Sequence, residues 1–459
     1  MYNFSRTIAA ISTPPGKGGV ALIRISGEGA FGIADACFRP YYGEAPLSSR
    51  KARTAIRGDI HHEGETIDDG IAILYPAPHS YTGEDTVEIT CHGGVLVTRM
   101  VLEALFSAGA VPAEAGEFTR RAFLNGTITL NEAESIGNLL DATCVGQVRL
   151  AAKDSRTKLS QALLSLHEEM VSLLGSLWAV IDYPEEDLAE LTNEELCARL
   201  RALQGKITAL CGTYRTGRAI QEGIETVIVG RPNVGKSSLY NLLCCEEAAI
   251  VTDVAGTTRD ILTRTVALGD VTLRLCDTAG LRETEDSVER IGVARSRSRM
   301  EEAELIFAVF DGASPLTQED LALIDTLKAL DATVIAILNK ADVGSLPMPE
   351  IYESFPHVLS LSAKEGDTVA LTSLVQTLFM DGDIRIGDTA IVSQARQYAT
   401  LKQAEALVES TLRALEAGLP ADVACSDLEL ALGAMGETDG RAVSEDVVAN
   451  IFSHFCVGK

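Results

Sequence analysis

The segment GRPNVGKS at residues 230–237 decides the fold of this chain of 459 residues. It fits the pattern G-x-x-x-x-G-K-[ST], follows a predicted strand over residues 226–230 and precedes a helical pattern. In that context the glycines let backbone N–H groups surround phosphate oxygens, Lys236 supplies a positive charge, and the hydroxyl of Ser237 can bind Mg²⁺. The segment therefore predicts a phosphate-binding loop that opens a helix in an α/β domain.

Four more motifs follow this loop in chain order, near the ends of predicted strands. TDVAGTTRD at 252–260 lies where a nucleotide-sensing loop is expected, with Thr258 as a second hydroxyl for Mg²⁺, and DTAG at 277–280 brings an acid near that ion. NKAD at 339–342 carries Asp342, which can accept the N1 and exocyclic N2 protons of guanine, and SAK at 362–364 can support the base. Because adenine offers no such pair of donors, the five motifs together predict binding of GTP with Mg²⁺.

Two features of these motifs bear on hydrolysis. Leu281 follows DTAG, where many small GTPases have a water-orienting glutamine, so a partner or another group must assist. Asn233 either helps to hold a monovalent cation, with carbonyls of the loop at 252–257, or only stabilises the turn. The residues expected to contact the nucleotide and its cations are Asn233, Val234, Gly235, Lys236, Ser237, Ser238, Thr252, Asp253, Val254, Ala255, Gly256, Thr257, Thr258, Asp277, Thr278, Ala279, Gly280, Asn339, Lys340, Ala341, Asp342, Ser362, Ala363 and Lys364.

Strands alternate with helical patterns around the loop, which is typical of a mostly parallel sheet with helices on both faces. The predicted strands are 226–230, 261–268, 271–277, 305–311, 333–338 and 358–361. Residues 130–216 and those after 390 have a helical period instead. Their leucine spacing fits either a coiled coil or the inner face of a bundle, and we favour the bundle because the heptads stop early.

The N-terminal part mixes short strands, predicted at 20–25, 70–75 and 86–90, with helical patterns, and it indicates an α+β domain. The simplest architecture inserts the α/β domain into a helical domain whose two parts pack together. We therefore expect a chain of several domains: 1–122, an α+β domain; 123–220, the first helical part; 221–380, the inserted α/β domain; and 381–459, the second helical part.

Composition limits the possible partners and compartments. The formal net charge is −26, so the chain does not resemble a free-standing nucleic-acid binder, and any RNA must be held by a local patch or a basic partner. The ten cysteines form no C-x-x-C pair, which favours reduced thiols in the cytoplasm over a disulfide framework. We find no apolar run of the roughly 18 residues that a membrane span requires.

Several motifs converge on one family. They are the GTTRD and DTAGLRE segments with the GRPNVGKSSLYN loop, TPPGKGGVALIRISG, YTGEDTVEITCHGG and GEFTRRAFLNG near the N-terminus, and the terminal FCVGK. Over essentially its whole length the chain resembles the MnmE (TrmE) family of bacterial tRNA-modification GTPases. The resemblance implies an N-terminal folate-binding domain that forms a homodimer, a helical domain split by the GTPase domain, and a hetero-oligomer with the flavin-dependent partner MnmG (GidA).

The resemblance also implies a reaction. The pair would install a carboxymethylaminomethyl or aminomethyl group on carbon 5 of the wobble uridine in certain tRNAs, the tRNA being held mainly by the partner. The carbon would come from 5-formyl- or methylene-tetrahydrofolate. GTP hydrolysis would depend on K⁺ and on dimerisation of the GTPase domains.

The resemblance assigns further residues by motif. Glu289 matches a switch-region glutamate proposed to orient water, although its position also suits an ordinary exposed helix charge. Cys456 is either a functional thiol or a buried cysteine at a helix end. Arg24, Glu88 and Lys459 match folate contacts, although Arg24 alone suits a strand-flanking charge and Glu88 an outward-facing strand residue. The remaining assignments are the K⁺ loop, with Asn233, Thr252, Val254 and Thr257, and the Mg²⁺ ligands Ser237 and Thr258.

One departure from the family and one alternative function remain. Thr127 stands where the family usually has a lysine soon after F-L-N-G, and the segment at 113–117 lacks the usual R-P-G-E. The alternative is an Era-like regulatory GTPase in ribosome assembly. Such a factor is expected to carry a basic RNA-binding module, whereas this chain has acidic helices and FCVGK.

Overall fold

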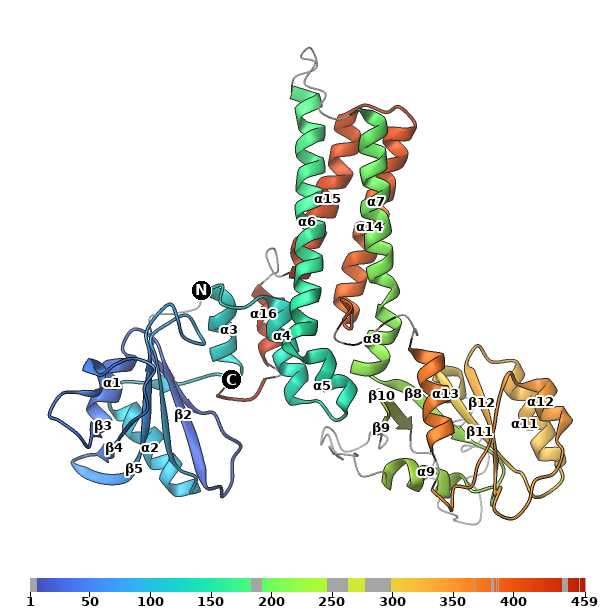
Figure 1. Ribbon diagram of the computed structural model, residues 1–459, viewed down its shortest axis with the longest axis horizontal. Coiled ribbons are helices and arrows are strands. Elements are labelled where there is room, and N and C mark those ends of the chain that lie inside the picture. Colours follow the sequence, from blue (N-terminus) through green and yellow to red (C-terminus); the bar gives the residue numbers. More distant parts are fainter. Residues whose placement is uncertain are drawn as a thin grey trace. The chain divides into compact units, whose positions relative to one another are not determined.

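The computed structural model describes residues 6–182, 192–245, 263–276, 299–366, 368–380, 384, 386, 388–439, 445–453 and 455–458. They form two compact units (Figure 1): residues 1–137 with 439–459, and residues 138–438. The first unit therefore joins the two ends of the chain. Helix α4 (Leu130–Leu140) begins in the first unit and ends in the second.

The first unit is built on a seven-stranded sheet with the order β3-β4-β5-β6-β2-β1-β7, in which the β1–β7 pair is parallel and the other pairs are antiparallel. Its strands are β1 (Ile8–Ile11), β2 (Val20–Ser26), β3 (Phe38–Pro40), β4 (Ile56–His62), β5 (Glu65–Tyr75), β6 (Thr86–His92) and β7 (Val111–Pro112). The three strands predicted in this part all form, and the α+β prediction is confirmed.

Strand β2 shows why one face of this sheet is apolar and the other polar. Ala21, Ile23 and Ile25 alternate along the strand and pack in one buried cluster with residues of helices α1 (Ala30–Cys37) and α2 (Val95–Ser107). The intervening Arg24 points to the opposite face, where the first turn of α3 (Glu117–Leu124) contributes Phe118. The short 3₁₀ helix Leu47–Ser49 and helix α16 (Glu445–Ser453) complete the unit, and Phe452 of α16 packs with residues of α4.

The second unit contains a helical bundle. Helices α6 (Lys153–Asp182), α7 (Asn193–Gly212), α14 (Ala395–Glu416) and α15 (Ala421–Asp439) lie side by side in Figure 1 and share one buried cluster. Leucines from Leu159 to Leu177 of α6 pack there with Leu401 of α14 and Leu428 of α15, so the bundle interpretation is confirmed over the coiled coil. Shorter helices α5 (Val145–Ala151) and α8 (Tyr214–Gln221) belong to the same unit.

The α/β part of this unit has a six-stranded sheet with the order β13-β12-β11-β8-β10-β9, parallel except for the β9–β10 hairpin. Its elements are β8 (Ile224–Val229), α9 (Lys236–Cys245), β9 (Thr263–Leu268), β10 (Val271–Cys276), β11 (Leu305–Asp311), α11 (Gln318–Lys328), β12 (Thr333–Asn339), α12 (Pro349–Ser354), β13 (His357–Ser360) and α13 (Val369–Phe379). All six strands were predicted, and β11 has the predicted bounds.

Strand β11 explains the layering of this sheet. Its apolar run is buried on both faces, with Phe307 in one cluster beside α9 and α13, and Phe310 in the other beside α11 and α12. The carboxyl ends of the parallel strands meet at one edge, which is where such sheets bind ligands.

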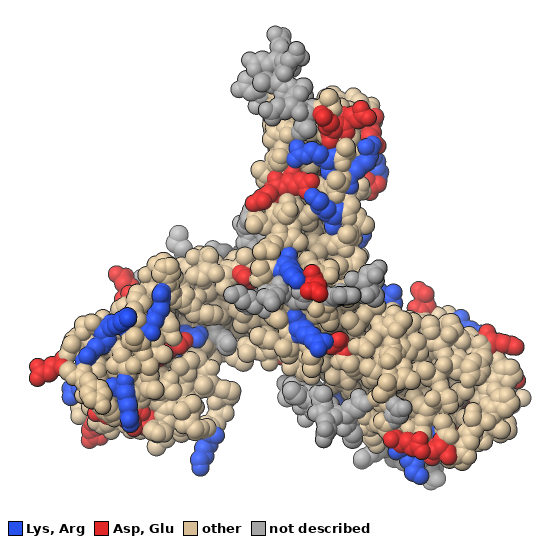
Figure 2. Space-filling view, viewed as in Figure 1, with Lys and Arg blue, Asp and Glu red and all other residues tan. Residues whose placement is uncertain are grey.

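Surface charge and helix hydropathy also bear on possible partners. On the face drawn in Figure 2, Lys and Arg side chains lie among Asp and Glu and do not gather in one broad patch. Among the described residues, no helix is both long and apolar enough to cross a membrane.

Candidate functional site

The phosphate loop follows β8 and needs three left-handed backbone positions. Gly230, Asn233 and Gly235 have φ of 151°, 65° and 102°. At Gly235 a Cβ would lie 2.0 Å from Nδ2 of Asn339, so this position requires glycine for both its backbone angle and its packing. The loop is thereby held against the end of β12.

Lys236 directs its ammonium group into this loop. Its Nζ donates to the carbonyl oxygens of Gly230 and Arg231, each at 2.8 Å. Burial lowers the pKa of Lys236 from its ordinary value, because desolvation disfavours the charged form. The hydroxyl-bearing Ser237 and Ser238 at the start of α9 are exposed, as is Asn233, so their oxygens are accessible to a ligand. The helix N-terminus adds a favourable dipole for phosphate.

The guanine-recognition motifs lie at the same edge of the sheet. Asn339 is 3 % exposed and joins two loops, because its Nδ2 donates to the carbonyl of Val234 at 2.8 Å and its Oδ1 accepts from the N–H of Ala363 at 2.9 Å. Asp342 is exposed, and its Oδ1 accepts a hydrogen bond from Ser362 at 2.7 Å. The structure thus brings the residues at 233–238, 339–342 and 362–364 together. The predicted residues Thr252, Asp253, Val254, Ala255, Gly256, Thr257, Thr258, Asp277, Thr278, Ala279, Gly280, Glu289 and Lys459 lie outside the described residues.

In the first unit, Arg24 and Glu88 face each other across β2 and β6. Nε and Nη2 of Arg24 donate to Oε1 of Glu88 at 3.0 and 2.8 Å, and the two side chains are only 13 % and 19 % exposed. The guanidinium also lies over the rings of Tyr81 and Phe118, 4.9 and 5.6 Å from their centroids. Neither residue is therefore the flanking or outward-facing charge that the strand pattern alone allowed.

A buried network adjoins this pair and was not predicted. Arg121, which is 1 % exposed, forms ion pairs with Glu84 at 2.9 Å and Glu117 at 2.8 Å, and Glu84 also accepts from Ser26 at 2.8 Å. Burial raises the pKa of nearby Tyr75, and Glu88 raises it further. The network fixes α3 beside the polar face of β2. The only sequence signal was a Glu-Arg pair spaced i,i+4 on a short helix, at Glu117 and Arg121.

Cys456 is exposed and follows α16, so the alternative of a buried cysteine at a helix end is wrong. The segment is held by its backbone: Val457 bridges Ala115, and the hydroxyl of Ser12 donates to the carbonyl of Gly458 at 2.8 Å. Thr127, at the position of the family's lysine, donates to the carbonyl of Ala122 at 2.7 Å.

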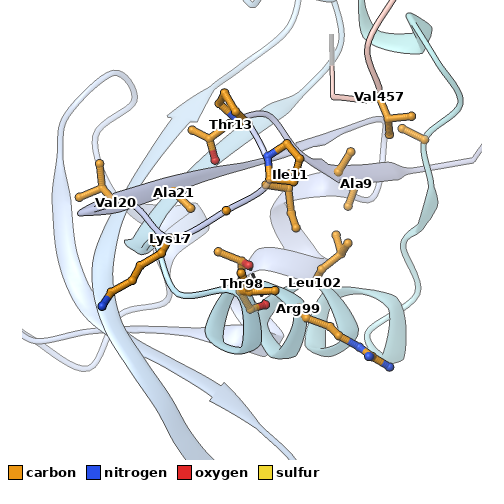
Figure 3. Close-up of a pocket in the computed structure, with 18 of the residues that line it drawn as sticks. Ala9, Ile11, Thr13, Lys17, Val20, Ala21, Thr98, Arg99, Leu102 and Val457 are labelled. Carbon is orange, nitrogen blue, oxygen red and sulfur yellow. Dashed lines mark hydrogen bonds between the residues drawn. The ribbon is translucent and has the colours of Figure 1, made fainter. Parts of the chain in front are cut away.

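A cavity of about 730 Å³ lies in the same unit, between β1, the loop after it and α2. Its lining is mainly apolar and includes Leu102, Phe106 and Val457. Figure 3 shows the side chains of Lys17 and Arg99 extending outward at two sides of this cavity. Arg99 is paired with Glu103 at 2.8 Å, so the cavity itself offers mainly apolar contacts.

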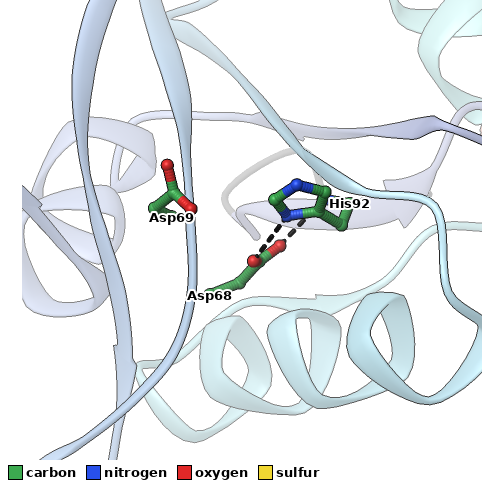
Figure 4. Close-up of side chains that lie close together, drawn as sticks. All are labelled: Asp68, Asp69 and His92. Atoms are coloured by element: carbon green, nitrogen blue, oxygen red, sulfur yellow. Dashed lines mark hydrogen bonds and ion pairs between the residues drawn. The ribbon is translucent and has the colours of Figure 1, made fainter.

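A second cluster missed by the sequence analysis comprises Asp68, Asp69 and His92. Figure 4 shows Asp68 facing His92, with the hydrogen bond to Nδ1 at 2.7 Å, and this bond raises the pKa of His92. Asp69 pairs with Arg57 at 2.9 Å. The members come from two neighbouring strands, β5 and β6, so their spacing in the sequence shows no metal-binding pattern. Their contacts are ordinary cross-strand interactions: Asp68 with His92, and Asp69 with Arg57.

Two family models match the chain. The family described as "GTP-binding protein TrmE N-terminus" matches residues 7–127, and "MnmE helical domain" matches residues 130–456. The tRNA modification GTPase MnmE of Heliobacterium modesticaldum is 41 % identical, covering 99 % of this chain and 99 % of that protein. The protein of the same name from Bacillus subtilis is 40 % identical, covering 99 % of this chain and all of that protein.

Among solved structures, the G domain of the T. maritima FeoB iron transporter is similar over 34 % of this chain, at 21 % identity and a TM-score of 0.27, too slight a likeness to argue from. The full-length relatives and the two family matches are decisive, and they agree with the loops for phosphate and guanine described above. The chain belongs to the MnmE family of tRNA modification GTPases.

Proposed function

We propose that this protein hydrolyses GTP to drive modification of the wobble uridine in certain tRNAs. With a flavin-dependent partner it adds a carboxymethylaminomethyl or aminomethyl group to carbon 5, using a one-carbon unit of 5-formyl- or methylene-tetrahydrofolate. The observation that carries the proposal is a guanine-nucleotide site on a chain that matches tRNA modification GTPases along its whole length. An Era-like role in ribosome assembly lacks comparable support.

The folate would bind at the polar face of the first unit. Its pterin ring presents neighbouring N–H donors. Glu88 is a carboxylate paired with Arg24, and the guanidinium of Arg24 lies over two aromatic rings. A carboxylate accepts from such donors, and aromatic rings stack on a flat heterocycle. Lys459 is a further proposed contact, by its place in the terminal motif. Cys456 is exposed in that motif and is our candidate for the chemistry at the base or the one-carbon unit.

The cations would bind at the phosphate loop. Ser237 and Thr258 are the proposed Mg²⁺ ligands, both hydroxyl oxygens that suit a hard cation. Asn233 is our candidate for a K⁺ ligand, because the residue is exposed and has a left-handed backbone conformation in the loop. Thr252, Val254 and Thr257 would add further oxygens. Bound K⁺ would supply positive charge to the phosphates. Glu289 is proposed to orient water, because Leu281 has no group for this task.

The partners follow from charge and family. The net charge of −26 and the interspersed charges in Figure 2 support a tRNA held mainly by the flavin-dependent partner, in the cytoplasm. We further propose a homodimer formed through the N-terminal domains, whose GTPase domains associate during hydrolysis.

The test is a complementation experiment in cells that lack the gene. Nucleosides from total tRNA are separated and identified by mass spectrometry, in cells carrying the wild-type protein, Cys456→Ser or Asp342→Asn. We expect the wild-type protein to restore the modified wobble uridine and both variants to fail. Purified Cys456→Ser should retain GTPase activity, because Cys456 is in the first unit and the nucleotide loops are in the second. Normal wobble uridine in the deletion strain, together with defective ribosomal subunits, would favour the alternative.

A further inference from the structure

Asp311 is a buried acid at the end of β11 to which the sequence motifs assign no role. It is 8 % exposed, and its Oδ2 accepts a hydrogen bond from Nζ of Lys340 at 2.7 Å. Nη2 of Arg231 lies 3.9 Å from the same oxygen, and the N–H of Ala313 donates to Oδ1 at 3.1 Å. One carboxylate thus faces a cation of the guanine loop and a cation of the phosphate loop.

The contact with Lys340 spans a strained turn. Lys340 has a φ of 69°, a left-handed conformation that is unfavourable for residues other than glycine. It links Asn339, whose side chain is buried and hydrogen-bonded, to Asp342, which is exposed and carries the acceptors for guanine. Holding the side chain of Lys340 therefore helps to hold the turn that sets the position of Asp342.

The surroundings of Asp311 favour its charged form. Burial acts to raise the pKa of Asp311, but hydrogen bonds from Lys340 and Ala313 outweigh it and leave the pKa below its ordinary value. On the other side, Nε of Arg231 donates at 3.1 Å to Oδ2 of Asp320, which also accepts from the N–H of Thr317, the N-cap of α11. The carboxylate is therefore ionised at neutral pH and lies in a chain of charges from α11 to the guanine loop.

We propose that Asp311 is a positioning residue for guanine recognition. Through Lys340 it fixes the turn that presents Asp342 to N1–H and the exocyclic amino group of guanine. Through Arg231 and Asp320 it ties this turn to the phosphate loop and to α11. The proposal concerns the nucleotide site alone and does not depend on the tRNA chemistry.

The test compares GDP with inosine diphosphate, which lacks the exocyclic amino group, by titration of the full-length protein. In Asp311→Asn we expect GDP affinity to fall about tenfold, as for loss of one charge-assisted hydrogen bond. Inosine diphosphate should lose less, so that the affinity ratio of the two nucleotides moves toward one. A purely structural role would lower both affinities equally. Asp325→Asn, at an exposed acid on α11, is the matched control and should change neither.

A double-mutant cycle identifies the contact. Lys340→Met keeps most of the side-chain stem without the charge, and we expect it to move the ratio as Asp311→Asn does, with no further loss in the double variant. An unchanged ratio in Asp311→Asn, equal losses for both nucleotides, or additive losses in the double variant would overturn the proposal. If Asp311→Asn fails to fold, Lys340→Met decides alone, and an unchanged ratio in that variant overturns the proposal.

Discussion

Replacing Arg24 by Met should destabilise the first unit far more than replacing a matched arginine at its surface. Arg24→Met leaves the carboxylate of Glu88, only 19 % exposed, without its cation, and it removes the guanidinium that lies over Tyr81 and Phe118. Breaking a fully buried pair in this way costs about 3–5 kcal/mol, and the residual exposure of Glu88 lowers our expectation to about 2–3 kcal/mol. For a domain of this size that corresponds to a fall in Tm of roughly 4–12 °C.

The matched control is Arg57→Met on strand β4 of the same sheet. Arg57 and Asp69 also form an ion pair at 2.9 Å, but their side chains are 65 % and 37 % exposed, so water solvates the carboxylate that remains. Exposed pairs contribute about 0–1 kcal/mol, and we expect a correspondingly small change. Thermal unfolding of the full-length variants, followed by calorimetry, measures both.

A double variant separates the cost of lost packing from the cost of an unpaired charge. In Arg24→Met with Glu88→Leu neither charge of this pair is left, so no carboxylate is buried without its cation there, and the double variant should recover at least about 1 kcal/mol relative to Arg24→Met alone. Binding of 5-formyl-tetrahydrofolate should be lost in the single variant, which lacks the proposed contact of Arg24. It should stay lost in the double variant, which lacks the proposed contacts of both Arg24 and Glu88. A single variant no less stable than Arg57→Met would refute the reasoning, as would purely additive losses in the double variant.

Three further predictions concern the nucleotide loops and the thiols. Gly235→Ala should abolish nucleotide binding in a titration, because its Cβ would meet Nδ2 of Asn339 at 2.0 Å and its φ of 102° disfavours alanine; affinity within threefold of wild type would contradict this. Asp342→Asn should change the preferred nucleotide from guanine to xanthine. A variant that still selects GTP in a competition experiment would contradict the role of Asp342 in guanine recognition. At pH 8 a maleimide should label the exposed Cys456 before Cys37. Burial raises the pKa of Cys37 to about 11, so roughly 0.1 % of that thiol is thiolate at pH 8, and its labelling should accelerate as the pH rises. Equal labelling rates of the two cysteines, measured by peptide mass spectrometry, would contradict this.

The sequence predicted the candidate nucleotide loops because their determinants are local. A phosphate loop needs glycines at left-handed positions and a lysine at the start of a helix, all within one short segment. The loops at 230–237, 339–342 and 362–364 therefore lie where their motifs predicted, at the ends of β8, β12 and β13. Long apolar runs such as that of β11 also predicted the central strands correctly, since a strand buried on both faces has no polar alternation.

Only the tertiary structure decided which charges meet. Arg24 reaches Glu88 because β2 pairs with β6 in one register, and Asp311 reaches Lys340 because β11 and β12 end side by side. Likewise the segment of Cys456 is placed by a backbone bridge between Val457 and Ala115, which lie far apart in the chain. Strand register and the docking of distant segments follow from the sum of many packing contacts, and no short motif encodes them. The sequence therefore supplied the chemical groups, and the fold supplied their partners.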